Sequence, residues 1–98
     1  MMSLRSICKE AIAAFGAKNQ IKKCIEELGE LSVALAHYED GKDTLDHVAE
    51  EIADMEIMLQ QMQLLFRCQS VVEAHRVNKM HRLREKIAKA KVEGCNNG

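Results

Sequence analysis

Glutamate and aspartate side chains cluster in two short stretches of this 98-residue chain. The first stretch, EELGE, supplies Glu26, Glu27 and Glu30, and the second, EEIAD, ends in the pair Glu51 and Asp54. Acids three residues apart lie on one side of an α-helix. Four carboxylates gathered from two helices would repel one another and lose hydration unless a cation compensated their charge. Such a group is a natural cage for a hard divalent ion.

The types of donor narrow the choice of metal. Only carboxylate oxygens are on offer, which favours Mg²⁺ or Mn²⁺. A carboxylate-bridged di-iron bundle requires Glu-x-x-His pairs, and none of the histidines in the sequence follows a glutamate by three residues. Either acidic pair alone is typical of a solvated helix surface. It is their repetition on consecutive helical stretches that indicates a metal site.

The elements that must position these acids are predicted to be helices. The chain has no proline and no alternating strand pattern, and its apolar residues recur at helical spacing over residues 3–15, 19–38, 44–66 and 70–93. Gly16 is expected to end the first helix. Asp43 or Thr44 is expected to cap the third, and Ser70 with Glu73 has the capping-box spacing that opens the fourth.

Two apolar stripes are expected to form the core, and the acids flank them. The second helix carries Ile21, Ile25, Leu28 and Leu35 at helical spacing, and the third carries Leu45, Val48, Ile52, Met55 and Leu59. Glu27 and Glu30 lie on the same rotational side of their stripe as Glu51 and Asp54 do of theirs. The two pairs are therefore predicted to share a facet, whereas Glu26 points further away.

Composition and length indicate a small all-α protein that assembles with other copies. Hydrophobic residues make up 47% of the chain and aromatic residues 3%. A chain this short buries only about 65% of the surface that its unfolded form exposes. We expect one domain over residues 1–98, with a four-helix bundle-like protomer whose short connections favour antiparallel neighbours.

Cellular context is predicted from the cysteines and the hydropathy pattern. The cysteines show no Cys-x-x-Cys spacing, which argues against a zinc knuckle or a thioredoxin-like motif. The N-terminal stretch makes a poor signal peptide, and no apolar run approaches the ~20 residues that span a bilayer. A soluble cytoplasmic protein without membrane contacts is the expectation.

Charge is divided unevenly between the two ends of the chain. Residues 1–66 contain six basic against twelve acidic residues, whereas residues 67–98 contain eight against three. The basic end alone would suggest nucleic acid, but the acidic front half argues against a general phosphate-backbone binder. An alternative to an enzyme stays open: a non-catalytic helical interaction module whose basic fourth helix binds an acidic partner or nucleic acid.

The run Gln20…EELGEL…EEIAD resembles the all-α nucleoside triphosphate pyrophosphohydrolases, the MazG-like group that includes the dimeric dUTPases and dCTP pyrophosphatases. The family signature is Glu-Glu-x-x-Glu followed, after a gap, by Glu-x-x-Asp, and the separation of the two halves here falls within the family's range. The resemblance extends from about Phe15 to Arg84. It implies a (d)NTP pyrophosphohydrolase that releases pyrophosphate and a nucleoside monophosphate in nucleotide-pool house-cleaning, and that works as a homodimer or homotetramer.

The resemblance also assigns roles to individual residues. It implies that Glu27, Glu30, Glu51 and Asp54 bind Mg²⁺, and that a positioned water attacks the α-phosphorus. Glu26 matches the first acid of the signature and is expected to orient water or a metal ligand. It implies that the basic residues Lys79 and Arg82 contact substrate phosphates, and Lys23 is a further candidate because it lies one turn before Glu27.

Overall fold

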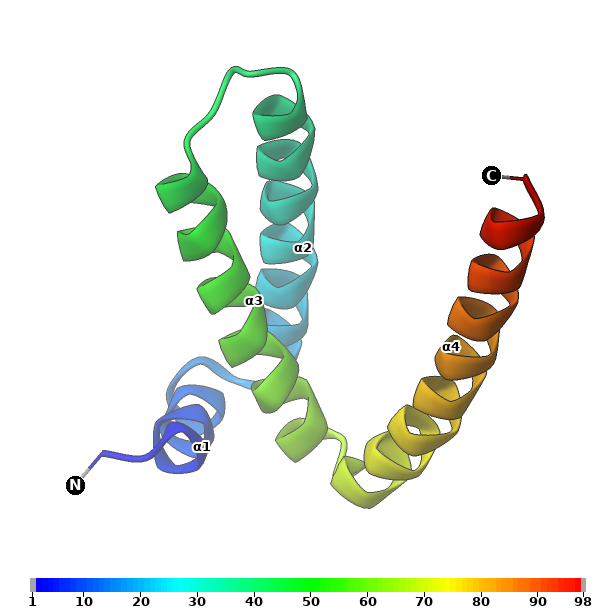
Figure 1. Ribbon diagram of the computed structural model, residues 1–98. Coiled ribbons are helices and arrows are strands. Elements are labelled where there is room, and N and C mark those ends of the chain that lie inside the picture. Colours follow the sequence, from blue (N-terminus) through cyan, green and yellow to red (C-terminus); the bar gives the residue numbers. More distant parts are fainter. Residues whose placement is uncertain (1, 98) are drawn as a thin grey trace. The chain divides into compact units, whose positions relative to one another are not determined.

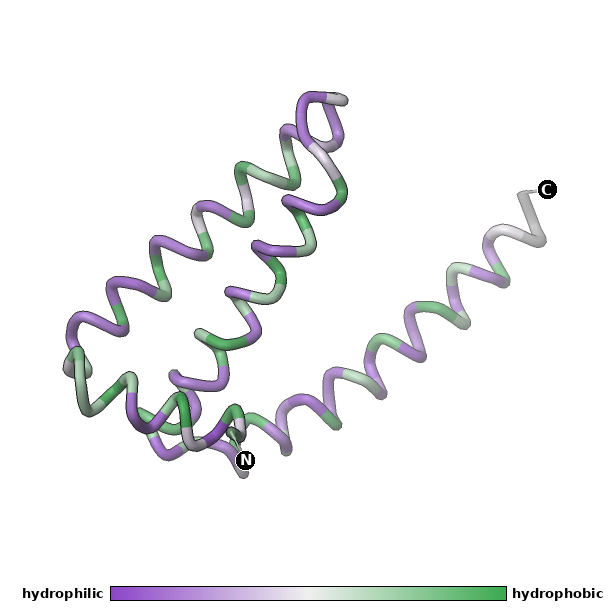
Figure 2. Tube along the Cα trace, turned by 90° about the vertical axis from the view of Figure 1, so that its left-hand side faces the viewer, coloured by the Kyte–Doolittle hydropathy of each residue, from purple (hydrophilic) through white to green (hydrophobic). Residues whose placement is uncertain are grey.

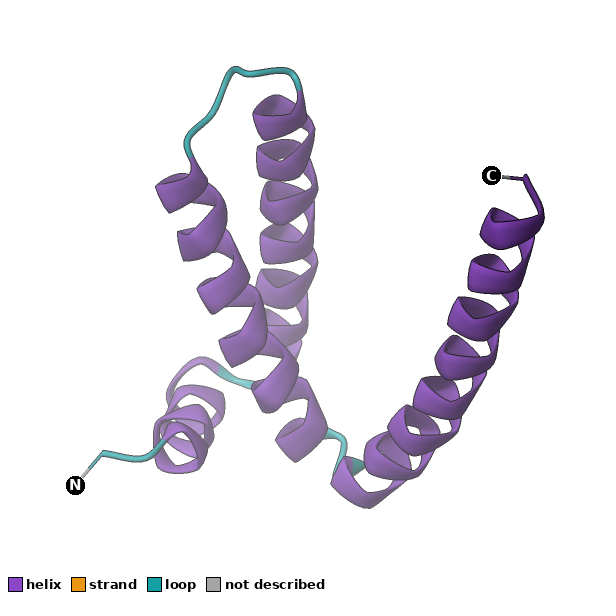
Figure 3. Ribbon diagram, in the orientation of Figure 1, coloured by secondary structure: helices purple, strands orange, loops and turns teal. Residues whose placement is uncertain are grey.

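The backbone of residues 2–97 is described by the computed structural model, with side chains described for residues 2–94. It contains four α-helices: α1 (Leu4–Phe15), α2 (Ala17–Glu39), α3 (Leu45–Leu65) and α4 (Gln69–Asn97). Within the described residues there is no strand (Figure 3). The predicted all-α class is confirmed. The chain divides into two compact units, Met1–Arg67 and Cys68–Gly98, which are described separately.

The turns of the first unit follow the predicted capping chemistry. Gly16 ends α1 with a φ of 87°, a conformation that glycine adopts without strain, and its N–H donates to the Ile12 carbonyl over 2.9 Å. Thr44 caps α3: its side-chain oxygen accepts a hydrogen bond from the His47 N–H at 3.1 Å. Asp43 Oδ1 in turn accepts from the Thr44 N–H at 2.7 Å. Both N-cap candidates therefore contribute to the start of α3.

Helices α2 and α3 form a hairpin, and α1 packs against both of them (Figure 1). The five-residue connection 40–44 is short enough to make the two long helices antiparallel neighbours. Cys8 of α1 is fully buried, and its Sγ lies 3.8 Å from the Ile57 carbonyl of α3. Burial raises the pKa of the Cys8 thiol, so this cysteine is a small core hydrophobe.

The predicted core stripes are wrong at most positions. Ile25, Leu28 and Leu35 are about half exposed or more, as are Leu45 and Leu59. The residues that α2 and α3 bury instead combine small, thioether and polar side chains: Gln20, Glu27 and Ala34 on α2, and Val48, Glu51, Met55, Met58 and Gln61 on α3. The side of each helix that faces its neighbour is thus centred on the acids, one residue away from the leucine and isoleucine stripe.

The second unit is the single helix α4. It begins at Gln69, so Ser70 lies inside the helix and the predicted capping box is wrong; Glu73 pairs with Arg76 instead. Hydrophobic and hydrophilic residues alternate along α4 (Figure 2). Its larger apolar side chains are exposed: Val77, Met80, Leu83, Ile87 and Val92. No helix in the described part of the chain combines the length and the apolar character that a membrane crossing requires.

Candidate metal centre

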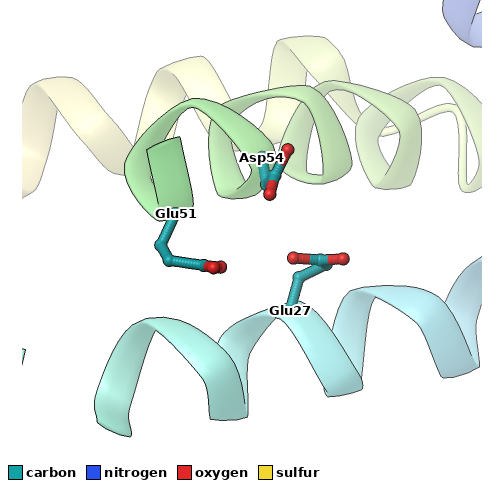
Figure 4. A group of neighbouring side chains, drawn as sticks. All are labelled: Glu27, Glu51 and Asp54. Atoms are coloured by element: carbon teal, nitrogen blue, oxygen red, sulfur yellow. The ribbon is translucent and has the colours of Figure 1, made fainter. Parts of the chain in front are cut away.

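Three of the predicted acids meet between α2 and α3. Figure 4 shows Glu51 and Asp54 of α3 pointing toward Glu27 of α2. One carboxylate oxygen from each residue lies within 4.8 Å of the others. We call Glu27, Glu51 and Asp54 together the carboxylate group. It arises because the Glu-x-x-Asp spacing places two acids on the same side of α3, opposite the buried Glu27 of α2.

Two of these acids are buried at the helix interface. Glu27 is 6% exposed and Glu51 9% exposed, whereas Asp54 reaches solvent. Among the described side chains, the buried oxygens without a hydrogen-bond partner are Glu27 Oε2 and Glu51 Oε2. Leaving a buried carboxylate oxygen unpaired is costly, and a divalent cation bound by oxygen ligands would satisfy both. The donor set therefore fits Mg²⁺ or Mn²⁺.

Each buried glutamate has one cationic or titratable neighbour from its own helix. Lys23 Nζ lies 3.1 Å from Glu27 Oε1, and this hydrogen bond raises the pKa of Lys23. His47 Nε2 lies 3.3 Å from Glu51 Oε1, and its Nδ1 lies 2.7 Å from Asp43 Oδ2. The hydrogen bond to Asp43 is the main cause of a raised pKa at His47. These partners contact only one oxygen of each glutamate and leave the other free.

The two remaining predicted acids lie at the exposed edge of the site. Glu30 is not part of the three-residue carboxylate group, but the negative charge of Glu27 raises the pKa of its carboxyl, with a smaller contribution from Glu51. The charges of the two buried acids therefore act on the Glu30 carboxyl, although Glu30 is exposed. Glu26 is also exposed, in line with its predicted angle away from the shared facet.

A pocket of about 580 Å³ opens beside the carboxylate group in the first unit. We call it the acidic pocket, because Glu26, Glu30, Asp43 and Glu51 line it. The two histidines of this unit, His37 and His47, line it as well, and the rest of its wall is Gly29, Val33 and Ala34. The pocket thus combines hydrogen-bond acceptors and imidazole rings with a small apolar wall.

A second pocket, of about 550 Å³, lies toward the start of α2. We call it the amide pocket, after Asn19, Gln20 and Gln61 in its wall, which also includes Lys22 and Lys23. Glu26 lines both pockets. The side-chain amide of Gln20 donates to Gln61 Oε1 at 2.6 Å, so this wall is held by a buried hydrogen bond between α2 and α3.

The sequence singled out most of the acids but missed their partners. His47 and Asp43 were not predicted as site residues; the only available signal was that Asp43, His47 and Glu51 follow one another at intervals of four residues. The predicted phosphate ligands Lys79 and Arg82 lie on the second unit, where both are exposed on α4. Lys23 lies in the first unit, paired with Glu27.

No protein-family model, no curated protein and no solved structure matches this chain.

Proposed function

We propose that this protein is a Mg²⁺-dependent nucleoside triphosphate pyrophosphohydrolase of the MazG-like type, acting on the cytoplasmic nucleotide pool. The observation that carries the proposal is the pair of buried glutamates on facing helices, each with a carboxylate oxygen that no protein group satisfies. A structural pair would have closed its hydrogen bonds. The signature that these acids belong to supplies the reaction, which is cleavage between the α- and β-phosphates.

The acids divide the work according to their burial. Glu27, Glu51 and Asp54 hold the ion, and Glu30 completes the set from the exposed edge. When bound, Mg²⁺ supplies Lewis acidity toward the triphosphate and lowers the pKa of water. Glu26 lines both pockets and orients the attacking water. As the water oxygen bonds to the α-phosphorus, the α–β bridging oxygen departs with pyrophosphate, and the water's proton passes to a carboxylate that lines the pocket.

Basic side chains balance the charge of the triphosphate. Lys23 contacts the carboxylate group through Glu27 and exchanges this partner for a phosphate oxygen when substrate binds. The family resemblance is the ground for proposing Lys79 and Arg82 of the second unit as further phosphate ligands, the lysine as a point charge and the arginine by paired hydrogen bonds. Replacing Arg82 with alanine should raise KM more than it lowers kcat.

A homodimer or homotetramer is the proposed working form. The first unit exposes apolar side chains on α2 and α3 that a monomer would leave in water: Ile25, Leu28, Leu35, Ile52 and Leu59. Large exposed apolar surfaces mark interaction sites. Sedimentation velocity should show a species of at least twice the monomer mass, whereas a monomer at micromolar concentration would contradict this assembly.

A panel of ribo- and deoxyribonucleoside triphosphates with Mg²⁺ tests the activity. We expect release of pyrophosphate and a monophosphate from at least one of them. Asp54→Asn should abolish turnover, and Glu50→Gln, which changes a neighbouring exposed acid of α3 outside the carboxylate group, should not. Absence of turnover on every nucleotide, together with salt-sensitive binding of nucleic acid by α4, would instead support an interaction module.

A further inference from the structure

Gly29 stands in the middle of α2 without a packing reason to be glycine. A Cβ built on it would meet no atom within 4 Å, so no neighbouring helix needs the space. Its φ is not positive, since within the described residues the glycines of that kind are Gly16 and Gly41. Glycine inside a helix costs about 1 kcal/mol relative to alanine. Glycine at this position therefore adds nothing to the stability of the protomer. Its effect is on the acidic pocket, whose wall has no side chain at Gly29.

The charges of the two pockets suit different parts of a nucleotide. Carboxylates line the acidic pocket and no lysine or arginine does, so an anionic phosphate would be repelled there. The amide pocket contains Lys22 and Lys23, which attract phosphate. The carboxylate group lies beside both, since Glu51 lines the acidic pocket and Lys23 of the amide pocket contacts Glu27.

Together with the bare wall at Gly29, these charges give the substrate a direction. We propose that the acidic pocket receives the uncharged nucleoside part of the substrate and that Gly29 is a positioning residue, whose missing side chain lets this part lie against the backbone of α2. The inference rests on the pyrophosphohydrolase function proposed above. The leaving pyrophosphate then lies toward Lys22 and Lys23.

The chemistry of the pocket wall fits a sugar and a base. Sugar hydroxyls and exocyclic amino groups are hydrogen-bond donors, and the carboxylate of Asp43, which has no role in holding the ion or the attacking water, is an acceptor in the same wall. His37 and His47 add flat rings. Glu51 lines the same pocket, so the pocket adjoins the carboxylate group at which the phosphate chain would be cleaved.

Replacing Gly29 with alanine tests the proposal, because stability and binding should change in opposite directions. We expect an unchanged or higher melting temperature, since alanine is the better helix former. Mg²⁺ binding should be unchanged, and KM for the nucleoside triphosphate should rise about tenfold, the effect of one unwanted methyl group in a fitted pocket. The matched control is Gly94→Ala on α4, where a Cβ would likewise meet nothing within 4 Å; its KM should not change.

Inorganic tripolyphosphate separates the nucleoside from the phosphates, because it carries the same anionic chain without sugar or base. Its inhibition constant should be equal for the wild type and Gly29→Ala. An unchanged KM in Gly29→Ala, or equal weakening of nucleotide and tripolyphosphate, would overturn the role of Gly29. A wild type that hydrolyses no nucleotide would overturn the proposed function itself, so the two failures are distinct.

Discussion

Two polar pairs are buried where α2 meets α3, and they differ in how they are satisfied. At one end of the interface Gln20 and Gln61 share a 2.6 Å hydrogen bond, and the Gln61 amide also lies 3.8 Å from the sulfur of Met58. Further along, Glu27 and Glu51 each retain a buried oxygen without a partner. The glutamines are neutral and hydrogen-bonded to each other, and we call them the closed pair. The glutamates carry like charges and each keeps an unpaired oxygen, and we call them the open pair.

This contrast distinguishes a structural polar contact from the proposed metal site. Buried polar groups in proteins are nearly always paired, and the glutamine pair meets that rule with protein atoms alone. A pair of like-charged acids cannot do so, because neither carboxylate has a proton to donate when ionised. Their position at the interface is the observation on which the proposed metal site rests.

The largest expected effect comes from removing one charge of the open pair. Glu51→Gln should lower turnover by about 10³-fold, because it removes a proposed ligand of the ion. The same change should preserve or raise the metal-free melting temperature, since it relieves repulsion from Glu27. Steady-state kinetics and thermal melts without Mg²⁺ check the two halves. A variant that loses activity by unfolding would instead make Glu51 a structural residue.

Metal addition is the next test of the same contrast. Mg²⁺ should stabilise the wild type, by about 2.7 kcal/mol at one hundred times its dissociation constant, because it binds the folded state only. Asp54→Asn should weaken this response, and the melting temperature of either protein should return to its starting value when EDTA is added. A wild-type melting temperature that is indifferent to Mg²⁺ and Mn²⁺ would mean that the acids do not form a metal centre.

The closed pair predicts a different pattern of energies. Gln20→Leu should destabilise the protein by about 1–3 kcal/mol, because it leaves the buried Gln61 amide without its partner. The double variant Gln20→Leu, Gln61→Leu should be less destabilised than the sum of the two single variants, since it removes both polar groups together. Urea unfolding of the four proteins measures this coupling. Additive energies would show that the two glutamines do not act as a pair.

Helical period and capping chemistry were enough to predict the four helices, and the facing of the three central acids followed from their spacing. Gly16 and Thr44 end and begin helices because their local geometry depends on few neighbours. The predicted start of α4 was one residue late. Ser70 and Glu73 have the spacing of a capping box, but Ser70 lies inside the helix and so cannot be its N-cap.

The core was harder to predict. The helical spacing of apolar residues shows that they share one side of a helix, but it does not show which side packs against a neighbouring helix. Ile25 and Leu28 form the more apolar stripe, yet α3 packs against the side of Glu27 and Ala34. The hydrogen bond between Gln20 and Gln61 joins residues 41 positions apart, and a glutamine in the sequence does not reveal which distant residue it will pair with. The contact of His47 with Asp43 likewise depends on the conformation of the loop before α3, which places the Asp43 carboxylate beside the His47 ring.

The smallest expected effect concerns the pair Asp43 and His47 at the edge of the open site. Their hydrogen bond is the chief cause of both a raised pKa at His47 and a lowered pKa at Asp43. The stabilisation from His47 is complete below the ordinary histidine pKa of 6.5 and is lost as pH rises through the raised value. The stabilisation from Asp43 is present above the ordinary aspartate pKa of 3.8 and is lost as pH falls through the lowered value.

Between those limits both partners are charged, so Asp43→Asn should cost most near pH 5.5 and least near pH 9. Asparagine keeps an oxygen for the Thr44 N–H, so the cap itself is retained. The matched control is Asp46→Asn, an exposed acid in the first turn of α3, whose cost should lack this dependence on the His47 titration. Urea unfolding at the two pH values, with an NMR titration of the His47 ring, measures the effect. An equal cost at both pH values, or a His47 pKa that Asp43→Asn does not lower, would show that the contact contributes nothing in solution and that His47 is free to turn toward Glu51 alone.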